Sequence, residues 1–336
     1  MAESQAQPHA FLRSLSQQVK EFEPDFPSRG DLEGLGIQTF EVPFDPNENG
    51  ALKFDPCFFK PHPENLLKKY PIPPRVQKQY EVHLNIPHIR TIQDFIEKGL
   101  GVTEYPPGVA PILENLSCLD RPTYLIENEA YSQSQGLERV ISSHLSTPRR
   151  GPSDSFTLEH LRNQAYWSPD YKAGDPPTME GHEKPKTWRV ISHYRYADRP
   201  LKPHSVMSCI SGVRPTDTNR GLSTHELRAI VCTMLLRVNH KPFRTCRTHP
   251  ILVLSFLGDQ QGRVIQASYD GKGMILQYSQ IWSFADAEKA PVELFLRYRL
   301  SEPVGVTLLP KMKIITINMF QHMKSTLIYV RTIDTL

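Results

Sequence analysis

Long hydrophobic runs are absent from this chain of 336 residues. No stretch approaches the roughly 18 consecutive apolar residues that a helix needs to span a bilayer. The first residues also lack the basic segment and apolar run of a secretory signal. The sequence therefore predicts a soluble intracellular protein, cytoplasmic or nuclear, that is not secreted and has no membrane partner.

Cysteine is scarce and irregularly placed. The chain has 5 cysteines, an odd number, at Cys57, Cys118, Cys209, Cys232 and Cys246. Small secreted domains instead carry dense, even sets of cysteines that form a disulfide framework. We therefore expect a reducing compartment and no disulfide partner for any of the five.

Motifs that carry catalysis are missing as well. The sequence contains no G-x-S-x-G, P-loop, G-x-G-x-x-G or H-E-x-x-H pattern. The nearest approach to a metal set is spaced C-x7-H-x5-C-x2-H and consists of Cys232, His240, Cys246 and His249. It lacks the paired C-x2–4-C knuckle of structural zinc sites. We expect no metal and no cofactor, and the sequence favours a protein that is not an enzyme.

The most regular part of the sequence begins with a helix. Ser223-Thr224-His225-Glu226 matches the capping box, in which the Ser hydroxyl and the Glu carboxylate accept unpaired backbone N–H groups of the first turn. Apolar residues then recur every three or four positions, at Leu227, Ile230, Val231, Met234, Leu235 and Val238. This spacing predicts one apolar face in the core. Pro242 predicts the end of the helix.

Three segments typical of strands follow. Pro250–Leu257 is almost continuously apolar, which predicts a strand buried on both faces. Arg263–Tyr269 and Met274–Trp282 are joined by Asp270-Gly271-Lys272-Gly273, and Asp-Gly is a strong hairpin signal because both positions tolerate positive φ. The second and third strands should therefore be antiparallel neighbours.

The remaining elements complete a fold class. Pro291 is expected to begin another helix, and Lys313–Met319 and Thr326–Ile333 are possible strands. The order helix, strand, strand, strand, helix, strand favours an α+β fold with a mixed, largely antiparallel sheet and helices on one side.

Proline separates the chain into differently organised parts. Of its 30 prolines, 25 precede Thr216. We expect a Pro-punctuated, mainly helical or irregular region over 1–150, a linker-like stretch over 151–186, and an α+β core over 187–336. The length is compatible with one domain or two, so the front region could also pack with the core.

Acidic residues are few between Lys184 and Arg263. This region has 14 Lys or Arg against 4 Asp or Glu, a net charge of +10, so the rest of the chain carries −7 of the total of +3. Such asymmetry indicates a basic face that could bind an acidic protein surface or nucleic acid. The candidate binding residues are Arg189, Arg195, Arg237, Lys241, Arg244, Arg247 and Arg263, together with the aromatic residues Trp188 and Tyr194.

Two parts of this basic region leave alternatives open. Trp188–Tyr196 alternates like a strand, with aromatic residues on one face and cations on the other. Aromatics can stack on bases while cations follow phosphates, but the same pattern describes a half-buried strand with a solvated cationic side. Arg237–Arg247 contains no acid. The helix macrodipole favours cations only near the helix end, so a partner or internal ion pairs to the acidic front region would account for the rest.

The order of elements resembles the core of PD-(D/E)XK nucleases. The resemblance implies that Glu226 is the helix acid and Asp259, in the turn before the second strand, is the second acid. Gln277-Tyr278-Ser279 stands where that family has E-x-K, so the Lys is absent and the acid is an amide. Metal-dependent hydrolysis needs carboxylates to hold the cations. One alternative to a binding protein is therefore a divergent or degenerate nuclease. A separate alternative is a structural subunit of a larger assembly.

A second resemblance is carried by His249–Ala267 and Ser301–Gly305. These segments are similar to uncharacterised proteins of filamentous fungi. The resemblance covers a minor part of the chain and implies no activity.

Overall fold

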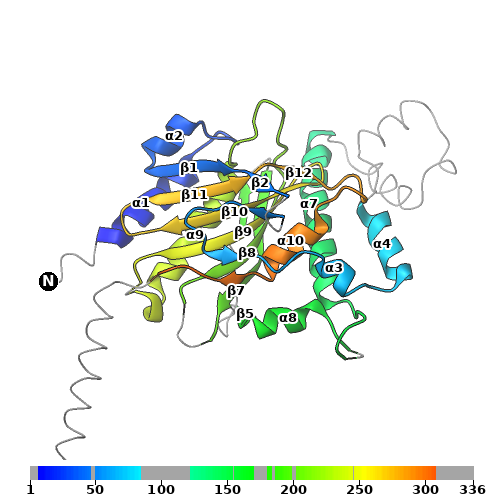
Figure 1. Cartoon of the computed structure of the whole chain (residues 1–336). Helices are drawn as coiled ribbons and strands as arrows, with labels where there is room; N and C mark the ends of the chain where they lie inside the picture. The colour runs from blue at the N-terminus through cyan, green and yellow to red at the C-terminus, as the bar shows by residue number, and fades with distance from the viewer. Residues whose placement is uncertain are drawn as a thin grey trace, which may run out of the picture.

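Helices pack on a large mixed sheet in the computed structural model of the chain (Figure 1). It describes residues 7–46, 50–84, 122–153, 155–169, 180–183, 186–198, 202–244 and 246–307. The helices are α1 (Gln7–Glu21), α2 (Arg29–Gly34), α3 (Leu66–Lys69), α4 (Pro74–Leu84), α7 (Pro122–Ser146), α8 (Leu158–Gln164), α9 (Thr224–Asn239), the short 3-10 helix η3 (Lys241–Phe243) and α10 (Val292–Arg299).

The strands are β1 (Ile37–Val42), β2 (Phe44–Asp45), β3 (Ala51–Leu52), β4 (Phe59–Lys60), β5 (Trp167–Pro169), β6 (Glu180–Glu183), β7 (Lys186–Tyr196), β8 (Ser205–Ser211), β9 (His249–Leu257), β10 (Gln261–Tyr269), β11 (Met274–Ser279), β12 (Trp282–Ser283) and β13 (Glu302–Pro303).

The main sheet has the strand order β1-β11-β10-β9-β8-β7-β5, with β12 paired to β10 and β6 paired to β7. β1 is parallel to β11 and β8 is parallel to β9, whereas the other pairs of this sheet are antiparallel. This arrangement confirms the α+β class and the mixed, largely antiparallel sheet.

Local signals in the sequence account for the helix and hairpin that follow Leu222. Glu226 N donates to Ser223 Oγ at 3.2 Å, and Ser223 N donates to Glu226 Oε2 at 2.7 Å, so the capping box is formed at the start of α9. β10 and β11 form the antiparallel hairpin across the Asp-Gly turn. The strands expected over 313–319 and 326–333 lie outside the described residues.

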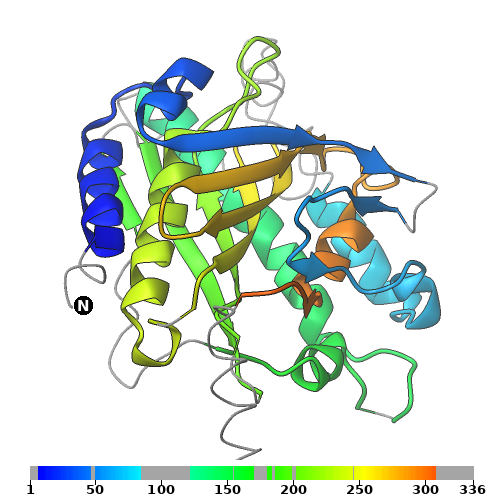
Figure 2. The ribbon, with the colours of Figure 1, turned by 60° about the vertical axis from the view of Figure 1, so that its left-hand side comes forward.

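Helices cover both faces of the sheet, which differs from the expectation of one covered side. Along β9, Leu252, Leu254 and Phe256 belong to the core shared with α7 and α10, whereas Ile251 and Val253 belong to the core shared with α1 and α9. Figure 2 shows α1 and α9 on one side of the sheet and α7 and α10 on the other. A strand that is apolar on both faces needs a cover on each, because exposed apolar surface is costly.

The front region contributes to the same sheet as the back region. β1 pairs with β11, and α7 packs against β8 and β9. α8 and β5 both lie inside the stretch 151–186, which therefore contains regular structure instead of being a plain linker. Among the described helices, none combines the length and the apolar character that a membrane span requires.

Candidate functional site

The structure divides the candidate basic residues into buried and exposed sets. Arg237 is 1% exposed and Arg263 is 0% exposed. Arg237 donates from Nη2 to the carbonyl oxygen of His204 at 3.2 Å, and its guanidinium lies 4.4 Å from the centre of the Phe243 ring. Arg237 therefore attaches the end of α9 to the start of β8. The expectation that Arg237 and Arg263 belong to an exposed basic face is wrong, because neither side chain reaches the surface.

Arg263 forms a buried ion pair with Glu226. Its Nε donates to Glu226 Oε1 at 2.8 Å and its Nη2 donates to Oε2 at 2.5 Å. The guanidinium also donates to the carbonyl oxygens of Arg220 and Gly221 at 2.9 and 2.7 Å. Burial alone would raise the pKa of Glu226, but the charge and hydrogen bonds of Arg263 hold this pKa below its ordinary value. Glu226, the acid that the nuclease resemblance implies, and Arg263, a candidate binding residue, thus neutralise each other's charge.

The other positions mapped by the nuclease resemblance also have structural partners. Asp259 Oδ1 lies 3.0 Å from Arg214 Nε. Gln277, in the E-x-K position, accepts a hydrogen bond from the backbone N–H of Asp55 at 2.7 Å. Within the described parts of the chain, no group of three or more His, Cys, Asp or Glu side chains could hold a metal ion. The nuclease alternative stays a prediction, and Glu226 would have to release Arg263 before it could bind a cation.

A β-bulge in β7 places Trp188 and Tyr194 on opposite faces of the sheet, whereas strict alternation would place them on the same face. The register between β7 and β8 shifts between Val190 and Ser192. Trp188 consequently lies in the core beneath α9, while Tyr194 packs against the core on the α7 side. One inserted residue reverses the direction of every side chain that follows. Trp188 and Tyr194 therefore do not share a face.

Three of the predicted cations form an exposed group, which we call the basic end cluster: Lys241, Arg244 and Arg247. Lys241 opens η3, and Arg244 Nε donates to the carbonyl oxygen of Asn239 at 3.3 Å. The backbone N–H of Arg247 donates to Thr307 O at 2.8 Å. None of the three forms an ion pair with any residue that the structure describes.

Arg189 and Arg195 lie near opposite ends of strand β7. Arg195 pairs with Ser205 at the start of β8, the end to which Arg237 attaches α9. Arg189 pairs with Ile210 near the other end of the same strand. Because a strand rises about 3.3 Å per residue, Arg189 is separated from the basic end cluster by roughly the length of β8. The predicted basic face is therefore limited to the end of the sheet at which β8 begins.

Of the residues spaced C-x7-H-x5-C-x2-H, for which we expect no metal, Cys232, His240 and Cys246 are half-buried and His249 is buried. His249 is buried, with Nε2 3.0 Å from the carbonyl oxygen of Phe243. Burial raises the pKa of the Cys246 thiol, and the charge of Arg237 offsets only part of this increase. The cysteines within the described residues, Cys57, Cys209, Cys232 and Cys246, carry free thiols.

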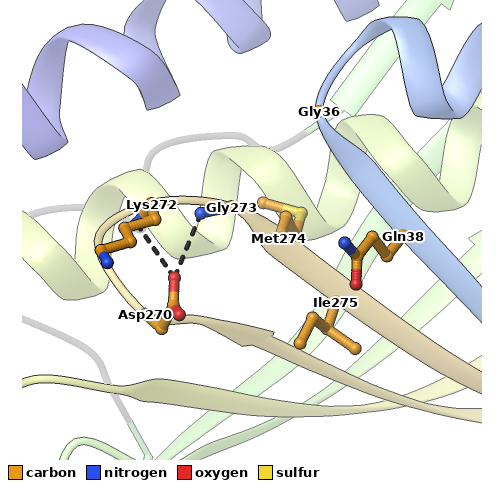
Figure 3. Close-up of a pocket in the computed structure, with 7 residues that line it drawn as sticks. All are labelled: Gly36, Gln38, Asp270, Lys272, Gly273, Met274 and Ile275. Atoms are coloured by element: carbon orange, nitrogen blue, oxygen red, sulfur yellow. Dashed lines mark hydrogen bonds between the residues drawn. The ribbon is translucent and has the colours of Figure 1, made fainter.

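A pocket of about 360 Å³ lies where β1 begins, beside the hairpin between β10 and β11 (Figure 3). It is lined by Gly36, Gln38, Asp270, Lys272, Gly273, Met274 and Ile275. Asp270 Oδ1 accepts hydrogen bonds from the backbone N–H groups of Lys272 and Gly273 at 2.9 and 3.1 Å. This carboxylate therefore stabilises the turn between β10 and β11. Sequence reasoning missed the pocket because Gly36 and Gln38, at the start of β1, are distant in the sequence from the hairpin residues that form the rest of the wall.

Two buried histidines support the fold around these features. Burial, with the nearby charge of Arg149, lowers the pKa of His144 to about 3. Burial also lowers the pKa of His204 to about 3, while its Nε2 lies 2.8 Å from the carbonyl oxygen of Val304. Both rings are therefore neutral near pH 7.

Lowering the pH should destabilise the protein through these two rings. Between about pH 6.5 and pH 3 the unfolded chain binds protons that the folded chain does not, so stability is full above this window and falls within it. Each histidine contributes up to about 1.4 kcal/mol per pH unit. Urea unfolding between about pH 7 and pH 5 should show the loss, and His144→Phe, which keeps a ring beside Tyr80, should make the slope shallower. An unchanged slope in this variant would contradict the assignment.

Comparisons of the chain with protein-family models, with curated proteins and with solved structures found no match.

Proposed function

We propose that the protein is a non-enzymatic binding protein that docks an acidic surface of another protein at the basic end cluster. The observation that carries this proposal is the exposure of Lys241, Arg244 and Arg247 within one short span at a single end of the sheet. Clustered cations attract an acidic partner and raise the rate of encounter.

The backbone beneath the cluster is held in place, which supports a binding role. Phe243, between Lys241 and Arg244, is 1% exposed and packs against the guanidinium of Arg237. Its carbonyl oxygen contacts buried His249, and its N–H donates to the carbonyl oxygen of His240 at 2.9 Å. A segment ordered before binding loses less conformational entropy when a partner docks.

The aromatic residues favour an acidic protein over nucleic acid. Trp188 is 5% exposed, and the ring of Tyr194 lies 4.5 Å from the guanidinium carbon of Arg162. Neither ring offers the open stacking surface that single-stranded nucleic acid uses. By contrast, Leu236 is 40% exposed on the last turns of α9, directly before the cluster. An apolar contact next to cations is typical of a protein interface.

Reversing two charges of the cluster should abolish salt-sensitive binding. We expect Arg244→Glu/Arg247→Glu to bind a fluorescent poly-glutamate peptide at least roughly tenfold more weakly than the wild type, because attraction becomes repulsion. Fluorescence anisotropy at about 50 and 300 mM salt would measure both affinity and its screening. Far-UV circular dichroism should be unchanged, since both side chains are exposed.

The matched control is Arg13→Glu/Lys78→Glu, which changes the net charge equally at exposed positions on α1 and α4. It should bind like the wild type. Equal weakening by both double variants would refute a local site and indicate only overall charge. Absence of peptide binding at low salt would refute the proposal, and tighter, equally charge-dependent binding of a single-stranded oligonucleotide would assign the cluster to nucleic acid instead.

A further inference from the structure

Two exposed aliphatic side chains lie next to the basic end cluster. Among the large apolar side chains in the described part of the chain, Leu236 is 40% exposed and Val306 is 84% exposed. A single exposed apolar side chain is ordinary on a protein surface and needs no explanation. These two, however, come from segments far apart in the sequence, and each lies beside a different arginine of the same cluster.

Leu236 lies beside Arg244. It occupies the last turn of α9, which ends at Asn239. Arg244 Nε donates to the carbonyl oxygen of Asn239 at 3.3 Å, so this bond holds the guanidinium at the end of the helix. Because a helix rises about 1.5 Å per residue, Leu236 is only about 5 Å from Asn239 along the helix axis. The aliphatic side chain and the guanidinium therefore belong to the same end of α9.

Val306 lies beside Arg247. The residue that follows it, Thr307, accepts a hydrogen bond at its carbonyl oxygen from the backbone N–H of Arg247 at 2.8 Å. The backbone N–H of Thr248 donates to the same oxygen at 3.4 Å. Figure 1 shows the chain after α10, in orange-red, running back towards the end of α9. Main-chain contacts therefore place Val306 next to the cluster.

The segment that carries Val306 is held in place by its neighbours. The backbone N–H of Val304 donates to the carbonyl oxygen of Phe58 at 2.9 Å, and Val304 O lies 2.8 Å from His204 Nε2. Gly305 has a φ of +81°, which favours glycine, and a Cβ at this position would lie 2.9 Å from the Phe58 ring. Val306 is therefore presented by an ordered backbone, so little conformational entropy is lost when a partner contacts it.

The chemistry of the partner follows from these side chains. Lys241, Arg244 and Arg247 form no ion pair with the residues that the structure describes, so they attract acidic groups. Leu236 and Val306 favour removal from water, which requires apolar groups on the partner. A segment in which acidic and aliphatic residues alternate at short intervals meets both requirements. A segment of acidic residues alone meets only the first.

An anionic membrane also combines charge with apolar groups, but it matches this surface less well. Basic segments that recognise acidic lipids typically have about 4–8 cations. Attachment through apolar groups needs a broad apolar helix face or an acyl chain. The basic end cluster has three cations, and its apolar neighbours are two separate side chains. A protein segment is therefore the better match.

We propose that the segment bound at the basic end cluster is acidic and amphipathic, and that its aliphatic side chains cover Leu236 and Val306 while its carboxylates pair with the cations. This inference rests on the proposed function, because the cations are the same. It adds a source of specificity, since charge alone does not distinguish one acidic segment from another.

Two fluorescent peptides of equal length and charge test the proposal with the full-length protein. One repeats Glu-Glu-Gly and the other repeats Glu-Glu-Leu, so they differ only in their aliphatic side chains. Fluorescence anisotropy should show that the wild type binds the leucine peptide at least roughly tenfold more tightly. Leu236→Ser/Val306→Ser should lose this preference and bind both peptides as the wild type binds the glycine peptide. Its far-UV circular dichroism should be unchanged, since both side chains are exposed.

Phe40→Ser is the matched control, because Phe40 is 48% exposed on β1, at the edge of the sheet. This variant should keep the preference for the leucine peptide. Equal binding of both peptides by the wild type would overturn this inference and leave the proposed function standing, whereas binding of neither would refute both. A preference that survives in Leu236→Ser/Val306→Ser would also overturn it.

Vesicles test the membrane alternative with the same variants. Wild-type protein should not bind phosphatidylcholine vesicles that contain about 30% phosphatidylserine more tightly than it binds the leucine peptide. Tighter binding to these vesicles, lost in Leu236→Ser/Val306→Ser, would overturn the proposal and assign the surface to a membrane.

Discussion

Replacing Arg263 with methionine should lower the free energy of unfolding by about 3–5 kcal/mol. The substitution removes both hydrogen bonds to Glu226 and leaves a carboxylate that is 0% exposed without its counter-charge. It also removes the donors to the carbonyl oxygens of Arg220 and Gly221, which lead into α9. Urea unfolding followed by circular dichroism would measure the loss as a lower midpoint.

Two further variants separate the ion pair from general damage. Glu226→Gln/Arg263→Met removes both charges, so it should be more stable than Arg263→Met alone. Arg29→Met breaks an exposed pair with Glu33 at 2.9 Å and should cost less than about 0.5 kcal/mol. If Arg263→Met were as mild as Arg29→Met, the burial of the ion pair would not matter to folding.

Truncation of Phe295 should be comparably severe. Phe295 lies on α10 with 0% exposure, and its ring contacts Phe256 and Phe284 with centroid distances of 5.6 and 5.0 Å. Phe295→Ala would remove these contacts and leave a cavity, with an expected cost of about 3–5 kcal/mol. Thermal and urea unfolding would measure it.

The matched variant Phe295→Leu keeps most of the volume and should cost less than Phe295→Ala. The difference between the two variants reports the cavity, because both lose the aromatic ring. Equal losses would mean that the ring contacts with Phe256 and Phe284 matter more than the filled volume.

Elements defined by neighbouring residues could be predicted from the sequence. The capping box at Ser223 depends on four consecutive residues, and the hairpin at Asp270 depends on a local turn. The continuous apolar run of β9 also predicts burial on both faces. The same run implies a second layer of helices, but the sequence does not say which distant segment supplies it. α7, from the front region, does so.

Features that depend on distant pairing could not be predicted. The charge count correctly indicates that cations gather between Lys184 and Arg263, but it does not distinguish Arg244, on the surface, from Arg263, beneath it. That distinction depends on Glu226, which reaches Arg263 only after α9 packs on the sheet. Similarly, alternation in β7 predicts one aromatic face, and a single bulge near Val190 reverses it.

The pairing of β1 with β11 bears on the order in which the chain can fold during its synthesis. Ile37 lies beside Met274 in the sheet, so β1 leaves the ribosome long before the strand that completes it. At ~5–20 residues per second, the delay is on the order of 10–50 s. During this time β1 has no strand to hold it, and its apolar residues are open to chaperones or to β1 strands of neighbouring chains. Closing so distant a contact is also slow, because the loop entropy is lost before the pairing stabilises the sheet.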